Sequence, residues 1–264
     1  MSSLTRMLSI LDVFSSTDTS LSAEAIAEKM KFTRTTCYRY VKELSQAGLL
    51  VSVNGVYTLG PRIINLDYKM RESDPLLSVG AELIKKLVDI TGGNGLLSSL
   101  YDEQIINVHH ETGGKDLHLG YSRGRAMPLF MGASSKVIVA SMKRARLKRL
   151  FERRGGDSDF QEFNGEWSNF WRYCQQIVQQ GYWVSRAELD AGHAGIAAPI
   201  PLSGAGEATT SLSLILRIEH FSLFDEAVLG RVVIDTANQI GARVSDAQVF
   251  MSSGRGGNKL GPVK

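Results

Sequence analysis

The chain is poor in cysteine and has no long hydrophobic run. Cys37 and Cys174, the two cysteines among 264 residues, lie far apart and outside any metal-type spacing. We therefore expect neither a disulfide framework nor a zinc site, and a reducing compartment, the cytoplasm, is favoured. No stretch approaches the roughly 20 apolar residues of a membrane helix. Asp12 interrupts the short apolar run near the first residue, so no signal peptide is expected.

Sequence motifs of common enzymes are also missing. H-E-x-x-H and a Walker loop do not occur, and the glycines of "GRGGNKLG" follow no predicted strand. His109 and His110 are adjacent, so on a strand their side chains would point to opposite faces and would not easily share one ion. His118 and His193 could join one of them in space. We predict a protein that is not an enzyme and has no catalytic residues, metal or cofactor.

The charge is nearly balanced, but the basic residues are not evenly spread. The chain carries a formal net charge of +3, with 43% hydrophobic and 22% charged residues. These values are typical of a globular protein with one large domain or two ordinary ones. Lysines and arginines gather in two windows, 29–42 and 143–149. Each window is either a solvated face or an anion-facing patch.

The first 60 residues predict a helical unit that ends in a hairpin. Apolar residues recur at helical spacing over 4–14, and further helices are expected to begin after the N-caps Ser22 and Thr33. Gly48 supplies the stop of the third helix. Asn54-Gly55, the pair that a type I′ turn prefers, then lies between two short β-type runs. This order predicts a helix-turn-helix followed by a wing.

The helix in "TRTTCYRYVKEL" has two kinds of face. Cys37, Tyr40, Val41 and Leu44 recur at helical spacing and should hold the helix to its domain. The remaining side chains are polar or basic and suit a DNA groove. With the tip of the wing, the candidate DNA-binding residues are Thr33, Arg34, Thr35, Thr36, Tyr38, Arg39, Lys42 and Asn54.

These candidates suit different parts of a DNA duplex. Arg34 or Arg39 can bind a guanine edge through two hydrogen bonds, whereas the threonines and Tyr38 suit phosphates or thymine methyl groups. Lys42 lies one turn further along the helix and suits a phosphate. Asn54 suits the DNA backbone or the minor groove. The alternative is a three-helix scaffold whose basic side only keeps it in solution.

The rest of the chain predicts an α+β unit. A helix opens at Pro61 and leads to a joint near 73–75. Beyond the joint we expect a helix, a hairpin around Asp102-Glu103, a strand over 116–124, a loop that runs into a helix, two further helices, three strands and a long final helix. Residues 251–264 are glycine-rich and charged, so a disordered tail is expected.

Three stretches carry a family likeness, and they are spread along nearly the whole chain. They are "TTCYRYVKELSQAGLL...YTLG" (35–60), "GRAMPLFMGASSKVIVA" (124–140) and "GYWVSRAELDAGHAGIAAPI" (181–200). In this order they resemble the recognition helix and wing, the "G-x-x-x-P-L-x-x-x-A-x-x-K-x-x-L-A" segment and the C-terminal signature of IclR-type bacterial transcription regulators.

That resemblance implies a fold and a mode of action. It implies a winged helix-turn-helix domain over 1–60, a linker helix over 61–74 and a GAF-like effector-binding domain over 75–250. It also implies a homodimer or homotetramer that binds double-stranded DNA at a pseudo-palindromic operator. A small organic acid would tune this binding.

The resemblance further implies which residues hold the effector. The N–H groups of Gly132 and Ala133 lie before a helix, where they can meet a carboxylate. Ser185 falls where the family often has an acidic residue, and Gly195 falls near a position that is often occupied by a small residue. Ser211 and Ser213, which alternate on one predicted strand, match a pair of serines in the family. The carried-over candidates are Met127, Leu129, Gly132, Ala133, Ser185, Arg186, Gly195, Ile196, Ser211 and Ser213.

One departure from the family bears on the ligand. Arg186 stands in a run that is typically acidic, and its guanidinium would favour an anionic ligand. The apolar stretch 127–131 suggests a wall for an aromatic or branched acid. The alternative is that these residues only form core and loop.

Other classes of function remain open at this point. The chain could be a ligand-binding sensor, a small-molecule enzyme built on a GAF-like domain, or a scaffold that binds another protein. The basic window 29–42 argues against the scaffold. A salt-dependent band shift on the promoter beside its own gene separates these classes.

Overall fold

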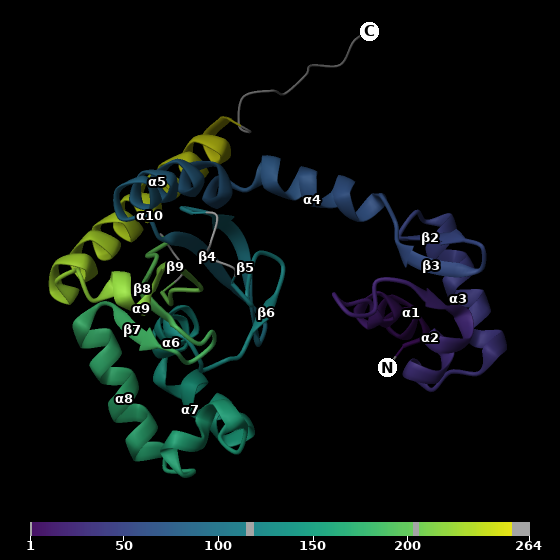
Figure 1. The fold of residues 1–264 in the computed structure, drawn as a ribbon, viewed down its shortest axis with the longest axis horizontal. Helices are drawn as coiled ribbons and strands as arrows, with labels where there is room; N and C mark the ends of the chain where they lie inside the picture. Colours follow the sequence, from purple (N-terminus) through teal and green to yellow (C-terminus); the bar gives the residue numbers. More distant parts are fainter. Residues whose placement is uncertain (1, 115–118, 203–205, 255–264) are drawn as a thin grey trace, which may run out of the picture. The chain divides into compact units, whose positions relative to one another are not determined.

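The structure, a computed structural model, describes residues 2–114, 119–202 and 206–254, with 248–254 described by backbone alone. The chain divides into two compact units, Met1–Asp74 and Pro75–Lys264, and each is described by itself (Figure 1). Within the described ranges, no helix combines the length and the apolar character needed to cross a membrane.

The first unit consists of short helices and a small antiparallel sheet. The sheet has the strand order β1-β3-β2. Its elements are α1 (Ser3–Leu8), the 3₁₀ helix η1 (Ser9–Val13), β1 (Leu21–Ser22), α2 (Ala23–Met30), α3 (Arg34–Gln46), β2 (Leu50–Val53), β3 (Val56–Leu59) and α4 (Arg62–Ser73).

Local signals in the sequence set the boundaries of these elements. The hydroxyl oxygens of Ser22 and Thr33 accept hydrogen bonds from the first turns of α2 and α3, so both predicted N-caps are confirmed. Asn54 and Gly55 have φ of 52° and 80°, the left-handed pair that a type I′ hairpin requires. The single helix predicted over 4–14 was wrong, because the chain tightens into a 3₁₀ helix from Ser9.

The core of this unit holds α3 by the face that the sequence predicted. Cys37, Val41 and Leu44 are almost fully buried, and Tyr40 is 5% exposed. Tyr40 also meets Phe32 edge to face. The opposite face of α3 is therefore left to solvent.

The second unit is built on one antiparallel sheet with helices on both faces. The described strands run in the order β6-β5-β4-β9-β8-β7. The elements are α5 (Pro75–Thr91), β4 (Asn94–Tyr101), β5 (Gln104–Glu111), β6 (Ala126–Met127), α6 (Ala133–Ala140), α7 (Arg144–Arg154), the 3₁₀ helix η2 (Ser158–Phe163), α8 (Trp167–Gln180), β7 (Trp183–Arg186), β8 (His193–Pro199), β9 (Thr210–Arg217), α9 (Ile218–Phe221) and α10 (Glu226–Gly254).

The two faces of this sheet have different cores. Helices α5 and α10 cover one face, where Leu212, Leu214 and Leu216 of β9 are buried. Helix α6 covers the other face, with α8 packed against it (Figure 1). An aromatic cluster around Phe130 and Phe170 fills the space beyond α6. Because side chains alternate along a strand, Ser211 and Ser213 lie on the α6 face.

Two parts of the second unit differ from the sequence prediction. Residues 119–124 form turns and not a strand, since Gly120 and Gly124 interrupt the run and the Asn107 side chain binds the Tyr121 carbonyl. Residues 251–254 continue α10 and so are not a disordered tail. The rest of the predicted strand, 115–118, and of the predicted tail, 255–264, lies outside the described residues.

Candidate effector pocket and DNA interface

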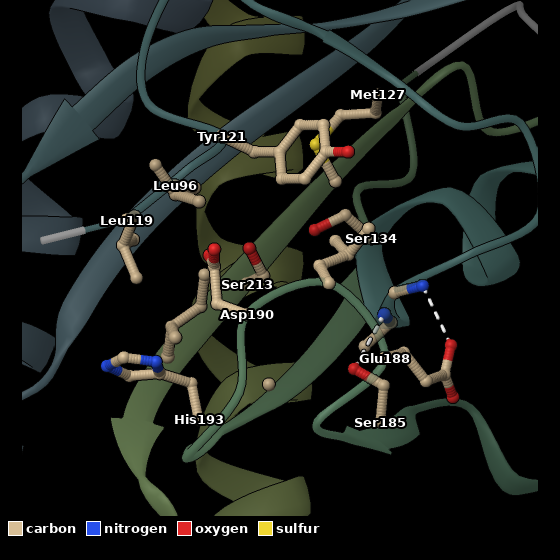
Figure 2. Close-up of a pocket in the computed structure, with 15 residues that line it drawn as sticks. Leu96, Leu119, Tyr121, Met127, Ser134, Ser185, Glu188, Asp190, His193 and Ser213 are labelled. Carbon is tan, nitrogen blue, oxygen red and sulfur yellow. Dashed lines mark hydrogen bonds between the residues drawn. The ribbon is translucent and has the colours of Figure 1, made fainter.

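A small cavity lies between the α6 face of the sheet and the loops that cross it (Figure 2). Its volume is about 40 Å³, well below the roughly 300–1,000 Å³ of most small-molecule sites. We call it the α6 pocket. It is lined by Leu96, Leu119, Tyr121, Met127, Gly132, Ala133, Ser134, Ser185, Glu188, Leu189, Asp190, His193, Gly195, Ser213 and Ile215.

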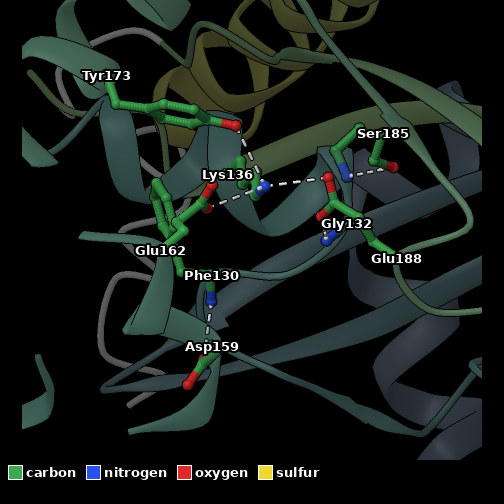
Figure 3. Close-up of polar contacts among 9 residues, drawn as sticks. Phe130, Gly132, Lys136, Asp159, Glu162, Tyr173, Ser185 and Glu188 are labelled. Atoms are coloured by element: carbon green, nitrogen blue, oxygen red, sulfur yellow. Dashed lines mark hydrogen bonds and ion pairs between the residues drawn. The ribbon is translucent and has the colours of Figure 1, made fainter. Parts of the chain in front are cut away.

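The first N–H groups of α6 are directed to side-chain oxygens at this pocket. Gly132 N donates to Glu188 Oε2 over 2.9 Å, and Ala133 N donates to Ser185 Oγ over 3.1 Å (Figures 2 and 3). The leading N–H groups of a helix have no intrahelical partner and carry partial positive charge, so they attract oxygen anions. The protein thus fills with its own side chains the place that a ligand carboxylate would suit.

Glycine is required at the start of α6. Gly132 has a φ of +77°, and a Cβ added there would lie 2.5 Å from Leu189 Cδ1. Such a conformation and such a distance disfavour any larger residue. The close approach of Leu189 also explains why the pocket is narrow.

A buried lysine supports the same carboxylate from the other side. Lys136 is 4% exposed, and its Nζ lies 3.0 Å from Glu188 Oε1 and 3.2 Å from the Tyr173 hydroxyl (Figure 3). Glu162 Oε1 is 3.6 Å away. Burial acts to lower the pKa of Lys136, but the charge of Glu188 and its other neighbours outweighs burial and holds that pKa above its ordinary value. The lysine therefore stays charged and fixes Glu188.

The other end of the pocket carries a second carboxylate. The Gly120 N–H donates to Asp190 at 3.2 Å from Oδ1 and 3.1 Å from Oδ2. Among the described residues no ion pair joins a cation to Asp190. His193 also lines this end, and neither of its ring nitrogens has a hydrogen-bond partner in the described chain. The same holds for the buried Ser213 hydroxyl.

Six of the predicted effector residues lie together at the α6 pocket. They are Met127, Gly132, Ala133, Ser185, Gly195 and Ser213. The missing side chain of Gly195 matters, because a Cβ there would lie 3.4 Å from Ser185 Oγ and 3.8 Å from Ile215 Cγ1. Glycine at this position leaves the floor of the pocket open.

Four predicted residues lie elsewhere. Ile196 is fully buried in the core on the α5 and α10 face, and Leu129 is buried with the aromatic cluster. The Ser211 hydroxyl donates to the Ser134 carbonyl beneath α6, so it packs under the helix. Arg186 follows Ser185 on β7 and pairs with Glu226 at the start of α10. The electrostatic argument that placed Arg186 beside the ligand therefore fails.

Glu188, Asp190 and His193 were not predicted to line the pocket. His193 is the first residue of β8, and Glu188 and Asp190 fall in the polar connection between β7 and β8, residues 187–192. Its polarity and its place between two strands are a weak signal for a loop that covers a site. Which of its side chains turn inward depends on contacts with 120–132, far away in the sequence.

The solvent face of α3 carries the predicted DNA-binding residues. Arg34, Thr35, Arg39 and Lys42 are exposed, as is Asn54 at the hairpin tip. In the part of the chain that the structure describes, no carboxylate forms an ion pair with these three basic side chains. They are therefore available for phosphates or base edges.

The remaining DNA-binding candidates, in α3 and its N-cap, form hydrogen bonds within the first unit. Tyr38 donates to Glu24 Oε1 over 2.6 Å, a contact between α3 and α2. This hydrogen bond lowers the pKa of Glu24 and raises that of Tyr38. Thr33 and Thr36 are linked by a hydroxyl contact of 2.9 Å in the cap of α3.

The second basic window, 143–149, behaves as an ion-paired surface. Arg146 binds Glu207 over 2.8 Å, and Lys148 lies 3.8 Å from Glu152 on the same helix. These contacts favour the solvated face over an anion-binding patch.

The described residues contain no group of three or more histidine, cysteine or carboxylate side chains that could hold a metal. His109 and His110 are neighbours on β5. His118, which was considered as a companion, lies outside the described residues.

Comparison with known proteins identifies the family. The model "IclR helix-turn-helix domain" matches residues 3–53, and "Bacterial transcriptional regulator IclR C-terminal" matches residues 70–242. The Pca regulon regulatory protein of Pseudomonas putida is 21% identical over 215 residues, which cover 81% of this chain and 74% of that protein.

Solved structures share the fold. An IclR transcriptional regulator from Alicyclobacillus acidocaldarius has a TM-score of 0.75 at 19% identity, covering 92% of this chain and 97% of that one. An IclR homologue from Microbacterium hydrocarbonoxydans, in complex with 4-hydroxybenzoate, has a TM-score of 0.75 at 17% identity, with 93% and 100% covered. The chain belongs to the IclR family of DNA-binding transcriptional regulators and is not an enzyme.

Proposed function

We propose that a small organic acid, aromatic or aliphatic, binds in the α6 pocket and changes the affinity of the first unit for its DNA operator. The observation that carries this proposal is the pair of N–H groups, of Gly132 and Ala133, at the end of a pocket that is otherwise largely apolar. A helix start of this kind binds carboxylates. Leu96, Met127 and Ile215 would contact the hydrocarbon part of the acid.

Binding requires a local rearrangement. Both N–H groups already donate to Glu188 and Ser185, and the cavity of about 40 Å³ is too small for an aromatic acid. The acid would displace one or both side-chain oxygens and move the loop 187–192 outward. Such a change gives the ligand different contacts in two states, which is what coupling to DNA affinity requires.

The comparisons support the class of ligand without identifying it. The Microbacterium homologue was solved with 4-hydroxybenzoate, an aromatic acid of the kind proposed here. That homologue is 17% identical to this chain, so its ligand is a probe compound for this chain and does not identify the effector.

On the DNA side, α3 would enter the major groove. We assign base contacts to Arg34 or Arg39 and phosphate contacts to Lys42, which are exposed and without a carboxylate partner in the described chain. Thr33, Thr35, Thr36 and Tyr38 would bind phosphates or thymine methyl groups, and Asn54 would meet the backbone or the minor groove. Tyr38 would first have to leave Glu24.

The protein is proposed to act as a homodimer or homotetramer on a pseudo-palindromic operator. Helix α4 has no buried residue, and Ile64, Leu66, Tyr68 and Met70 on it are 48–73% exposed. Apolar side chains in this density on one helix favour contact with another subunit. A twofold assembly would match a twofold operator. Action on the chromosome would place the protein in the cytoplasm.

Titration calorimetry with a panel of aliphatic and aromatic acids tests the effector, and a band shift on the neighbouring promoter with and without acid tests the response. We expect one acid class to bind and to change the shift. If an acid binds but no promoter DNA is shifted at low salt, the chain is a sensor without operator binding. If no acid binds, the effector proposal is wrong.

A further inference from the structure

We propose that Glu24, on α2, is a specificity-determining residue of the DNA face and that its carboxylate accepts a hydrogen bond from the amino group of a cytosine in the operator. The inference rests on the proposed function, because it requires α3 to enter the major groove. It adds a base contact from outside the recognition helix, and it names the base.

Glu24 lies beside the exposed end of an α3 side chain. Arg34 and Tyr38 are four residues apart on α3, so they share one face of the helix, and both are exposed. The hydroxyl group of Tyr38, at the tip of its side chain, donates to Glu24 Oε1 over 2.6 Å. Glu24 is exposed as well. Its carboxylate is therefore at the outer surface of the face that would meet DNA and is not buried between α2 and α3.

A carboxylate at this place opposes DNA binding in general. Arg34, Arg39 and Lys42 are exposed on α3, and the phosphates of any duplex attract such basic side chains whatever the sequence. The negative charge of Glu24 weakens that attraction. The hydrogen bond from Tyr38 above all, and also the charge of Arg34, lower the pKa of Glu24, so the carboxylate is ionised at neutral pH. Its charge is offset only on a duplex that offers it a hydrogen-bond donor.

The base edges in the major groove offer such a donor in two cases. Cytosine presents its N4 amino group, and adenine presents its N6 amino group beside the acceptor N7, whereas guanine and thymine present acceptors. An ionised carboxylate accepts hydrogen bonds and donates none. It therefore suits cytosine best, faces a repelling N7 on adenine, and finds no partner on guanine or thymine.

The hydrogen bonds of the free protein can be exchanged on such an operator without leaving a group unsatisfied. Tyr38 donates its hydroxyl group to Glu24 in the absence of DNA and would donate it to a phosphate in the complex. The amino group of cytosine then takes the place of that hydroxyl group at Glu24. With guanine or thymine at the same position, no donor replaces Tyr38, so Glu24 either withholds Tyr38 from the phosphate or faces acceptors.

Selection of duplexes from a randomised pool by the full chain, followed by sequencing, tests this assignment. We expect the wild type to select one cytosine at a fixed position in each half-site. Fluorescence anisotropy on the selected duplex then measures the preference. Replacing that C·G pair by T·A should weaken binding about tenfold, as the loss of a hydrogen bond to a charged group allows. The absence of a fixed cytosine, or equal binding to both duplexes, would overturn the proposal.

The variant Glu24→Gln locates the effect. A glutamine side chain has a donor as well as an acceptor, so we expect the variant to bind the two duplexes about equally. It should also bind an unrelated duplex more tightly than the wild type does, because a negative charge near the phosphates is gone. If Glu24 only stabilises α2 and its contact with α3, Glu24→Gln will weaken both duplexes alike and keep the preference for cytosine, and the proposal is wrong.

Glu28→Gln is the matched control. Glu28 is exposed one turn further along α2, so this variant removes an equal charge from the same helix. It should keep the wild-type preference for the C·G duplex over the T·A duplex. Equal loss of the preference in Glu28→Gln would assign the effect to the net charge of α2 and overturn the contact with cytosine.

Tyr38→Phe separates the two side chains of the contact. It removes the hydroxyl group that Tyr38 would donate to a phosphate, so we expect weaker binding to both duplexes by a similar factor, with the preference for cytosine kept. Loss of the preference in this variant would assign the reading of the base to Tyr38 and overturn the role of Glu24.

The outcomes separate this inference from the proposed function. If the full chain selects no DNA, operator binding through α3 is wrong and this inference is wrong with it. If the chain selects DNA but Glu24→Gln keeps the base preferences of the wild type, the role of Glu24 is wrong and operator binding stands.

Discussion

The two functional faces of the molecule are built in different ways. The candidate DNA face lies mainly on one helix, α3, and its basic side chains point to solvent without ion-pair partners in the described chain. The α6 pocket draws on α6, on five strands and on loops between residues 96 and 215, and its best donors are already bound to Glu188 and Ser185. On the proposed function, the basic side chains of the first face are available for DNA as they stand, whereas the second face must rearrange before it can bind an acid.

This contrast predicts that removing a buried charge beside the pocket lowers the stability of the second unit. Lys136→Met leaves Glu188 without its buried partner, and breaking such a pair costs about 3 kcal/mol. We expect a loss of this size in the free energy of unfolding of the second unit, measured by denaturant titration. The unfolding of the first unit should not change.

Two controls sharpen this prediction. Lys86→Met removes an exposed pair with Glu82 and should cost less than about 0.5 kcal/mol. The double variant Lys136→Met/Glu188→Leu should lie closer to the wild type than Lys136→Met alone, since no charge is left unpaired. If Lys136→Met proves as stable as Lys86→Met, the role given to Lys136 is wrong.

The same ion pair has a defined pH dependence. The pKa of Lys136 is raised in the folded chain above its ordinary value of 10.5. Its stabilising contribution is therefore complete below pH 10.5 and is lost as the pH rises through the folded-state pKa. The stability difference between the wild type and Lys136→Met should shrink in that alkaline range and stay constant from pH 7 to 9.

At the DNA face, removing one positive charge should weaken operator binding and leave the stability of the fold unchanged. Arg34→Ala and Arg39→Ala should each weaken operator binding, by about tenfold for the one that contacts a base. Fluorescence anisotropy on a labelled operator measures this. Arg172→Ala, an exposed arginine on α8, is the control. Wild-type affinity in both α3 variants would show that α3 is not the recognition helix.

The N-cap of α3 stabilises the helix that carries most of the candidate DNA-binding residues. Thr33→Ala removes the acceptor for the Thr36 N–H and should lower the stability of the first unit by about 1 kcal/mol. Thr33→Ser keeps the hydroxyl group and should restore most of that loss in thermal unfolding. Equal losses in both variants would assign the effect to the lost methyl group.

The smallest effect is expected at Arg186. Its guanidinium pairs with Glu226 and lies over the Phe221 ring, 5.3 Å from its centre. Arg186→Ala should therefore leave acid affinity within about twofold of the wild type, because an exposed ion pair contributes little. A tenfold loss of acid affinity, measured by calorimetry, would show that Arg186 does contribute to ligand binding.

The sequence predicts the first unit better than the pocket for a physical reason. Ser22, Thr33 and Asn54-Gly55 act through hydrogen bonds and dihedral angles within about three residues, so local patterns are enough. The pocket depends on register: Ser185 faces α6 and the adjacent Arg186 cannot, because strand side chains alternate. That rule was available from the sequence. The inward turn of Glu188 toward Gly132 was not, since it depends on packing between distant segments.

Reciprocal titration tests most directly whether occupancy of the α6 pocket controls operator affinity. The dissociation constant of the operator is measured with and without the tightest-binding acid of the panel, and that of the acid with and without operator. Linkage requires both ratios to be equal, and we predict a factor of about 5 to 150. A ratio of one, with the acid shown to be bound, would contradict control of the DNA face by the pocket.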